Sequence, residues 1–371
     1  MGAGLAAALV MGCAGGPAAA PPTTTPDLTS STAPEARSGF PPQPAGVPWP
    51  TEEWAEAPWP QGADRLAVDE ATDLAFADGA AERVRAVVIV HGGAIVYERY
   101  SPNPDDGPSV IMPSYSVAKS VTSAAVGILV RDGRLDPDQP APVPEWHADP
   151  DDPRQEITVE HMLHMASGMP WRDDFTKEGT EMYELVRSGD AGAYAAAQVP
   201  TAPPGTRFTY NSGTSTLLAR MVGDAVGNDA GDTRAFLEDE LFSKIGMDPV
   251  RTRFDGAGTW LGAFSADSTA RDFAKFGLLY LRGGEWDGDR ILDEDWVERT
   301  RTPSPANPEY GAQWWLDSHR PGVFYAIGIR GQVITADPAH DLLIVQLSTV
   351  GGPRPLAQTE AILDAFTFVE Q

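Results

Sequence analysis

A nearly continuous apolar segment, residues 117–131, contains one lysine, Lys119, three positions after Ser116. The length and hydrophobicity of this segment predict a buried helix. A charged ammonium is costly in such surroundings unless it has a partner, and the chain has only four lysines. Residues three apart lie on the same face of a helix, so the amine of Lys119 can reach the hydroxyl of Ser116. Burial disfavours the charged amine, which could then accept the proton of a serine nucleophile. The structural alternative is an N-cap serine followed by a surface lysine.

The pattern along the rest of the chain predicts strands near both ends and helices in the middle. Two β-branched segments, 85–91 and 94–100, flank Gly92-Gly93, which is typical of a hairpin. Further strands are expected at 323–328, 330–336 and 341–348, and further helices at 65–85, 158–166, 212–227, 233–245, 267–282 and 355–369. This order indicates an α+β fold, in which an antiparallel sheet is flanked by helices and a helical subdomain is inserted at roughly 134–255.

The first 50 residues have the composition of a targeting signal followed by a linker. The apolar run 5–11 is too short to span a bilayer as a helix. Gly12-Cys13 follows it and resembles a bacterial lipobox, so residues 1–13 are expected to be a signal peptide with lipidation at Cys13. A secretory signal without lipidation is the alternative. Residues 14–50, rich in Pro, Thr and Ala, are expected to be a disordered linker. We therefore expect an exported, extracytoplasmic protein that contacts the membrane only through its N-terminal lipid anchor.

Charge and cysteine content exclude several classes of protein. The net charge of −26 argues against nucleic-acid binding, which needs a basic surface. The single cysteine excludes an intrachain disulfide framework and a Cys-rich zinc site. His161 and His164 have the spacing of two metal ligands on one helix, but no third ligand accompanies them, so no metal site is expected. No cofactor is implied.

The segment Tyr115-Ser-Val-Ala-Lys-Ser120 resembles the first motif of the Ser-x-x-Lys serine hydrolases. That family includes serine β-lactamases, penicillin-binding proteins, related esterases and 6-aminohexanoate-dimer hydrolases. Residues 157–169 are similar to the Thr-x-x-x-Leu-Leu-x-x-x-Ser-Gly helix of the same family. The resemblance implies a β-lactamase/transpeptidase-like fold, with Ser116 as nucleophile, Lys119 as its activator and Tyr115 beside the substrate.

The segment Tyr210-Asn211-Ser212 is similar to the second family motif, with Ser212 where the family usually has Asn. This Tyr-x-Ser form looks most like the 6-aminohexanoate-dimer hydrolase and esterase branch. The resemblance implies that Tyr210, as a phenolate near a lysine, accepts the proton of Ser116 and later gives one to the leaving group. It also places Ser212 among the substrate-binding residues.

The third family motif corresponds to residues 328–332, which are expected on an edge strand. Gly331 would let the strand backbone approach the substrate, and the N–H groups of Ser116 and Gln332 would form the oxyanion hole. Ile329 stands where the family commonly has Lys or His, which puts binding of an anionic β-lactam in doubt. Arg330 either replaces that cation in the cleft or points away from it.

The aromatic segment 310–315 is interpreted as a wall of the cleft, with Trp314 against the substrate; core packing is the alternative. Together, the motifs predict that residues 51–371 form a serine hydrolase domain. It would cleave an ester or amide bond of a small-molecule or peptide substrate through an acyl-enzyme. The alternatives are a penicillin-binding D-alanyl peptidase, a β-lactamase, a peptide-processing amidase and a catalytically silent surface binding protein of the same fold.

Overall fold

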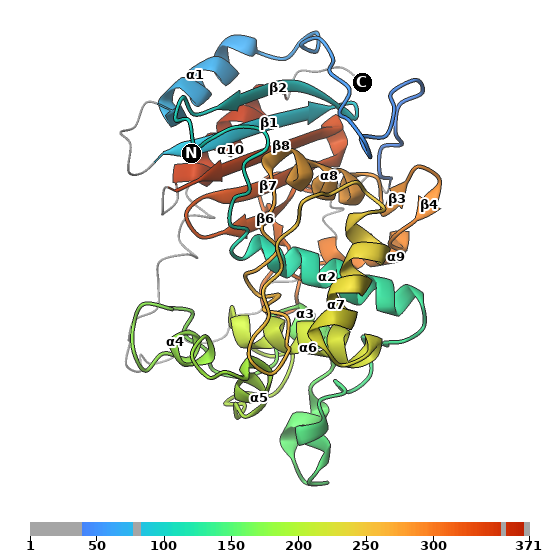
Figure 1. Cartoon of the computed structure of the whole chain (residues 1–371), viewed down its shortest axis with the longest axis vertical. Coiled ribbons are helices and arrows are strands. Elements are labelled where there is room, and N and C mark those ends of the chain that lie inside the picture. Colours follow the sequence, from blue (N-terminus) through green and yellow to red (C-terminus); the bar gives the residue numbers. More distant parts are fainter. Residues whose placement is uncertain (1–38, 77–82, 350–353, 367–371) are drawn as a thin grey trace, which may run out of the picture.

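The computed structural model describes residues 39–76, 83–349 and 354–366. Among these residues, six strands form one antiparallel sheet in the order β2-β1-β8-β7-β6-β5 (Figure 1). The N-terminal hairpin therefore pairs with the last strand of the chain, and the expected α+β architecture is confirmed. The strands are β1 (Val84–His91), β2 (Ala94–Tyr100), β5 (Trp315–Leu316), β6 (Phe324–Gly328), β7 (Gln332–Asp337) and β8 (Leu342–Ser348).

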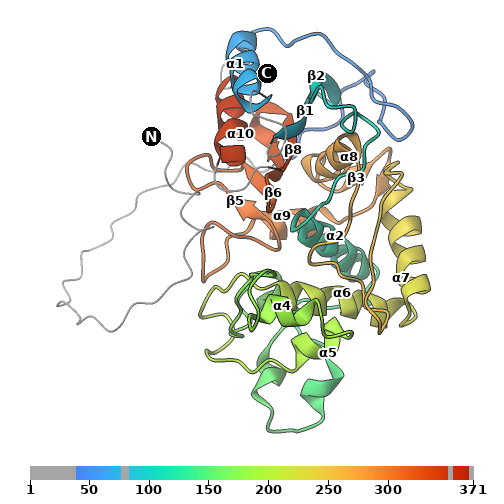
Figure 2. The same ribbon diagram turned by 60° about the vertical axis from the view of Figure 1, so that its left-hand side comes forward.

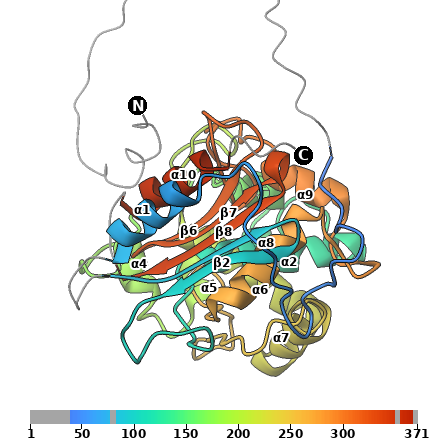
Figure 3. The ribbon, with the colours of Figure 1, turned by 90° about the horizontal axis from the view of Figure 1, so that it is seen from above.

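Helices cover both faces of the sheet (Figures 2 and 3). Helices α1 (Arg65–Phe76) and α10 (Arg354–Asp364) lie on one face, whereas α2 (Val117–Arg131) and α8 (Ala270–Leu281) lie on the other. Strand β1 contributes side chains to the core on both faces of the sheet, because successive side chains of a strand point to opposite faces. Val87 and Ile89 pack in the cluster that includes α1 and α10, and Val88 and Val90 pack in the cluster around α2 and α8.

The segments between α2 and α8 form the helical layer below the sheet in Figure 1. The layer contains α3 (Val159–Leu163), α4 (Glu181–Leu185), α5 (Ala191–Ala196), α6 (Ser212–Val226) and α7 (Ala230–Leu237), and 3₁₀ turns at Pro144–His147 and Pro153–Glu156. The helix expected over 233–245 begins earlier and continues as one π-helical turn, Glu238–Phe242. The sequence patterns missed the short helices α4 and α5, α9 (Glu294–Arg301) and the small hairpin of β3 (Glu285–Trp286) and β4 (Asp289–Arg290).

The interpretation of residues 14–50 as disordered is wrong for the segment from 39 onwards. Phe40 packs against Gly283, so closely that a Cβ on that glycine would lie 2.6 Å from the Phe40 ring. The Trp49 and Trp286 rings lie 5.0 Å apart. Just beyond residue 50, the N–H of Ile95 on edge strand β2 donates to the Ala55 carbonyl at 2.9 Å. Large aromatic side chains gain enough from burial to order a proline-rich segment that lacks periodicity.

The expected signal peptide, the lipidation site at Cys13 and linker residues 14–38 lie outside the described residues. Within the described ranges, no helix combines the length and the apolar character needed to cross a bilayer.

Candidate active site

Ser116 stands at the N-terminus of α2, where it makes no side-chain capping bond. Instead, Lys119 Nζ lies 3.1 Å from Ser116 Oγ, and this contact argues against the N-cap alternative. Tyr115 precedes the serine with φ of 44°, a left-handed backbone that costs a non-glycine residue roughly 1–3 kcal/mol. Ser116 is partly exposed while Lys119 is buried, so the hydroxyl remains accessible to a substrate and the amine is shielded from water.

Helix α6 supplies the second group of side chains. Asn211 caps this helix by accepting from the Thr214 N–H, which places Ser212 in the first turn. Lys119 Nζ donates to Ser212 Oγ at 2.9 Å and to the Ala263 carbonyl at 2.8 Å. The ring of Tyr210 lies with its centroid 5.0 Å from the same Nζ. The structure thus brings Ser116, Lys119, Tyr210 and Ser212 together from two helices about 90 residues apart in the sequence.

Burial controls the protonation of both titratable groups. Desolvation lowers the pKa of Lys119 to about 8, against a smaller opposing effect of the Asp173 carboxylate. At pH 7 about a tenth of the amine is therefore neutral. Desolvation raises the pKa of the Tyr210 phenol, and a hydrogen bond with Ser116 offsets this only in part. Burial thus disfavours the phenolate expected at Tyr210 and favours the neutral amine of Lys119.

Residues 329–331 form the turn between β6 and β7 rather than an edge strand. Gly328 ends β6 against the backbone of Ser114 and Ser116: a Cβ there would stand 2.6 Å from the Ser114 carbonyl oxygen and 3.2 Å from the Ser116 nitrogen. Gly331 lies in the turn with φ of 81°, and its expected approach to the substrate stays a prediction. Gln332 pairs with Gly328 across the strands, and its side chain donates to the Ser348 carbonyl. The oxyanion role of the Gln332 N–H remains a prediction.

Two residues inside this motif, Ile329 and Arg330, are exposed. Ile329 presents an aliphatic surface where a cation is common in the family. Arg330 has φ of 62°, as the turn requires, and its side chain is exposed. The alternation of a strand, which would have decided where Arg330 points, does not apply inside a turn.

The prediction that Trp314 touches the substrate is wrong. Its side chain is fully buried, with its ring stacked 6.0 Å from Phe276 and lying 4.6 Å from Tyr280. The neighbouring Trp315 takes the site position instead, because its ring stacks on Tyr210 at 5.6 Å. Trp314 lies just before β5 and Trp315 begins it, and the sequence does not show which of the two tryptophans faces the site.

Two further polar residues of the site are not evident from the sequence. Gln313, with φ of 65°, is a buried link between helices: Ser215 Oγ donates to its Oε1 at 2.7 Å, and its Nε2 donates to the Leu163 carbonyl at 2.7 Å. Asp173, in the loop after α3, influences the pKa of both Lys119 and Tyr210. No spacing rule distinguishes Asp173 from its acidic neighbours, so only the fold reveals it.

The two histidines of α3 have structural partners. His161 Nδ1 accepts from the Thr158 N–H as part of the helix cap. His164 Nε2 lies 3.1 Å from a carboxylate oxygen of Glu160. Among the described residues, no group of three His, Cys, Asp or Glu side chains is arranged to hold a metal ion.

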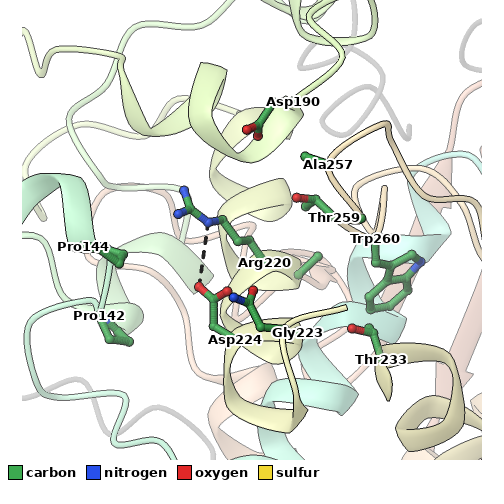
Figure 4. A pocket seen from close by; sticks show the side chains of 13 residues that line it. Pro142, Pro144, Asp190, Arg220, Gly223, Asp224, Thr233, Ala257, Thr259 and Trp260 are labelled. Carbon is green, nitrogen blue, oxygen red and sulfur yellow. Dashed lines mark ion pairs between the residues drawn. The ribbon is translucent and has the colours of Figure 1, made fainter. Parts of the chain in front are cut away.

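A separate pocket of about 360 Å³ lies toward the far end of α6 (Figure 4). Arg220 is in its wall, with Nε 3.7 Å from Asp224 and Nη1 2.8 Å from Glu145. The residues that line it include no serine or lysine. Ser116 lies outside this pocket, near the opposite end of the helix.

The sheet, the helical layer and the Ser116–Lys119 pair at the start of a buried helix define a serine hydrolase with a β-lactamase/transpeptidase-like fold. The chain belongs to the β-lactamase family, whose model matches residues 72–367. A 6-aminohexanoate-dimer hydrolase from Paenarthrobacter ureafaciens is 29% identical over 296 residues, covering 72% of this chain and 73% of that protein.

Solved structures share the fold at lower identity. A structure from Bacillus anthracis, provisionally assigned as a 6-aminohexanoate-dimer hydrolase, has a TM-score of 0.70 and 22% identity, covering 84% of this chain and 86% of that one. A family VIII carboxylesterase has a TM-score of 0.63 and 18% identity, covering 81% of this chain and 97% of that one.

Proposed function

We propose that the protein hydrolyses ester or amide bonds through an acyl-enzyme on Ser116. The observation that carries this proposal is the 3.1 Å contact between Ser116 Oγ and the buried Lys119 amine, whose pKa is lowered to about 8. The resemblance to amide hydrolases and carboxylesterases supports the same reaction class.

The lowered pKa of Lys119 and the raised pKa of Tyr210 suggest the following sequence of steps. Ser116 Oγ attacks the carbonyl carbon while neutral Lys119 takes its proton. The bond to the leaving group breaks, and the Tyr210 phenol gives its proton to that group. The ammonium then formed on Lys119 stabilises the Tyr210 phenolate. Water next attacks the acyl carbonyl and gives a proton to Tyr210, the bond to Ser116 Oγ breaks, and Lys119 returns its proton to Ser116. Substrate, water and products balance, and every side chain regains its starting state.

This assignment predicts how activity depends on pH. Because the neutral amine of Lys119 is the active form, kcat/KM for a neutral ester should rise about ten-fold per pH unit below the pKa and level off above about pH 8. A pH series with a p-nitrophenyl ester, corrected for spontaneous hydrolysis, measures the curve. A profile that is flat from pH 6 to 9 would contradict Lys119 as the base.

The proposal also predicts which acyl groups the site prefers. Ile329 cannot pair with a carboxylate, and a buried anion without a partner is costly. A charge-assisted contact is worth about 1.5–3 kcal/mol, so kcat/KM for a neutral p-nitrophenyl ester should exceed that for a chromogenic cephalosporin by roughly 10- to 10²-fold. Similar values for both would show that an anion is bound. In that case Arg330→Ala tests the remaining cation: loss of cephalosporin turnover with ester turnover retained would place the guanidinium in the cleft.

We further propose that the protein is exported and anchored through a lipidated Cys13, because an apolar run and a lipobox-like Gly-Cys begin the chain. In a bacterial host that makes the full precursor, the protein should fractionate with membranes, and Cys13→Ala should release it. More than one acyl chain would be needed, since a single chain binds only marginally. Equal recovery of both forms in the soluble fraction would refute the anchor.

A further inference from the structure

The turn that presents Ser116 has a strained backbone. Tyr115 precedes the nucleophile with φ of 44°, a conformation that a tyrosine keeps only where neighbouring groups impose it. The carbonyl oxygens of Ser114 and Tyr115 accept N–H groups from the first turn of α2, so this backbone leads directly into the helix. The direction of the Ser116 side chain at the start of the helix therefore depends on what holds residues 114 and 115.

A carboxylate holds the residue before the strained one. Oδ1 of Asp267 accepts from the Ser114 N–H at 3.0 Å and from the Ser114 hydroxyl at 3.2 Å. The same hydroxyl accepts from the Ala266 N–H at 2.9 Å, and Ser114 is fully buried. Removal of the carboxylate would take the acceptor from a buried backbone N–H. Such a group is costly without a partner, so the backbone of the turn would move to find another.

The segment that carries Asp267 also contacts the activating lysine. The backbone N–H and carbonyl of Asp267 pair with Arg251 at 3.0 and 2.8 Å, which fixes the residue in an antiparallel bridge. Four residues earlier, the Ala263 carbonyl accepts from Lys119 Nζ at 2.8 Å. Residues 263–267 thus hold the start of the turn and the amine of Lys119 in place relative to each other.

The Asp267 side chain is positioned to act through Ser114. Only 16% of the side chain is exposed, and its second oxygen, Oδ2, lies 3.5 Å from Nη2 of Arg253. That ion pair is long and the Arg253 side chain is 59% exposed, so the pair contributes little. What Asp267 supplies to the site is a fixed hydrogen-bond acceptor for Ser114.

We propose that Asp267 is a positioning residue of the Ser116 site: through Ser114 it keeps Tyr115 in the left-handed conformation that directs the Ser116 hydroxyl toward the substrate. This inference rests on the proposed hydrolase function. Without Asp267, the backbone at Tyr115 would relax toward negative φ and carry the nucleophile with it. A displacement of about 1 Å at a reacting atom can cost on the order of a hundred-fold in rate.

Asp267→Ala tests the proposal through the second-order rate constant for labelling of Ser116 by a fluorophosphonate, which needs no known substrate and no deacylation step. The rate constant should fall roughly ten- to a hundred-fold, the range set by the strain of one left-handed residue. Its rise toward about pH 8 should persist, because the bonds of Lys119 to Ser212 and the Ala263 carbonyl are unchanged.

The conservative variant Asp267→Asn separates the acceptor from the charge. Its amide oxygen can still accept from Ser114, so labelling should stay within about three-fold of the wild-type rate. A loss as large as that of Asp267→Ala would show that the negative charge acts on the site directly and would contradict a positioning role.

A second substitution distinguishes positioning from a loss of stability. Glycine adopts positive φ without steric cost, so in a Tyr115→Gly background the turn depends less on Asp267. Adding Asp267→Ala to that background should slow labelling by less than about three-fold, compared with Tyr115→Gly alone. A merely structural role, or any role that does not pass through the turn, would give the same factor in both backgrounds.

Asp255→Ala is the matched control for the loss of an aspartate that accepts backbone N–H groups. Asp255 accepts from Ala191 at 2.7 Å and from Thr259 at 2.8 Å, and Thr259 lines the separate pocket described above. The control should lower the thermal unfolding midpoint but leave the labelling rate of the folded protein within about two-fold of the wild type.

The outcomes separate the two proposals. If Asp267→Ala labels as fast as the Asp255→Ala control, or loses the same factor with Tyr115→Gly as without it, the role of Asp267 is refuted and the hydrolase remains. If Asp267→Ala melts below the assay temperature, Ser114→Ala takes its place. That variant removes only the hydroxyl part of the contact, and its loss must likewise shrink in the Tyr115→Gly background. If the wild-type protein is neither labelled nor active on simple esters, the proposed function is refuted and this inference with it.

Discussion

Ser116→Ala should lower kcat for a neutral p-nitrophenyl ester by at least about 10⁴-fold, since loss of a serine nucleophile removes the covalent pathway altogether. The hydroxyl makes no capping bond, so its removal takes no contact from the end of α2. The thermal unfolding midpoint should therefore stay close to that of the wild type. Steady-state kinetics and a melting curve on the same preparation measure both effects.

The matched control is Ser120→Ala, one turn further along the same helix. Its hydroxyl donates to the Gln313 carbonyl at 2.8 Å and does not contact Lys119. Loss of that hydrogen bond costs on the order of 1 kcal/mol of stability, and activity should fall by less than about ten-fold. If the Ser116 variant kept activity comparable to this control, Ser116 would not be the nucleophile.

Lys119→Met should lower kcat/KM at pH 7 by about 10³-fold, in the range that positioned acid–base groups contribute. Methionine fills a similar volume without the amine, so Ser116 keeps its place but loses its proton acceptor. The rise of activity toward pH 8 should disappear with the amine that causes it. The pH series described above, repeated on the variant, measures both changes.

Lys244→Met is the control for loss of a lysine. Lys244 is paired on the surface with Glu240 at 3.0 Å, and such pairs are worth less than about 1 kcal/mol. This variant should keep wild-type kinetics. A Lys119 variant within ten-fold of the wild type, with the pH profile preserved, would assign the base to another group.

Local sequence patterns predicted the main strands and helices well because more than one sequence feature indicated each of them. The β-branched residues and the Gly-Gly turn both indicate the β1–β2 hairpin, and Gly92 and Gly93 indeed have positive φ. The helix over 117–131 was predicted from hydrophobicity and is confirmed within those bounds. The single lysine of this helix would be costly to bury without a partner. The predicted helix therefore also indicated a chemical role for that lysine.

Predictions failed where the outcome depends on tertiary contacts. Phe40 and Trp49 order a proline-rich segment because they pack against Gly283 and Trp286. Trp314 and Trp315 are equivalent in the sequence, and only sheet packing decides that Trp315 lies against Tyr210. Asp173 gains its influence from the Trp171 indole, a side chain that no site motif contains.

Intact-mass measurement after a fluorophosphonate probe tests the central claim most directly, because the probe reacts only with an activated serine and needs no knowledge of the substrate. We expect one adduct per chain on the wild-type protein, located by peptide mapping at Ser116. It should form faster at pH 8 than at pH 6 and be absent from Ser116→Ala. A parallel incubation with penicillin should leave the mass of most of the protein unchanged. An unlabelled wild type, or stoichiometric labelling that persists in Ser116→Ala, would contradict the account.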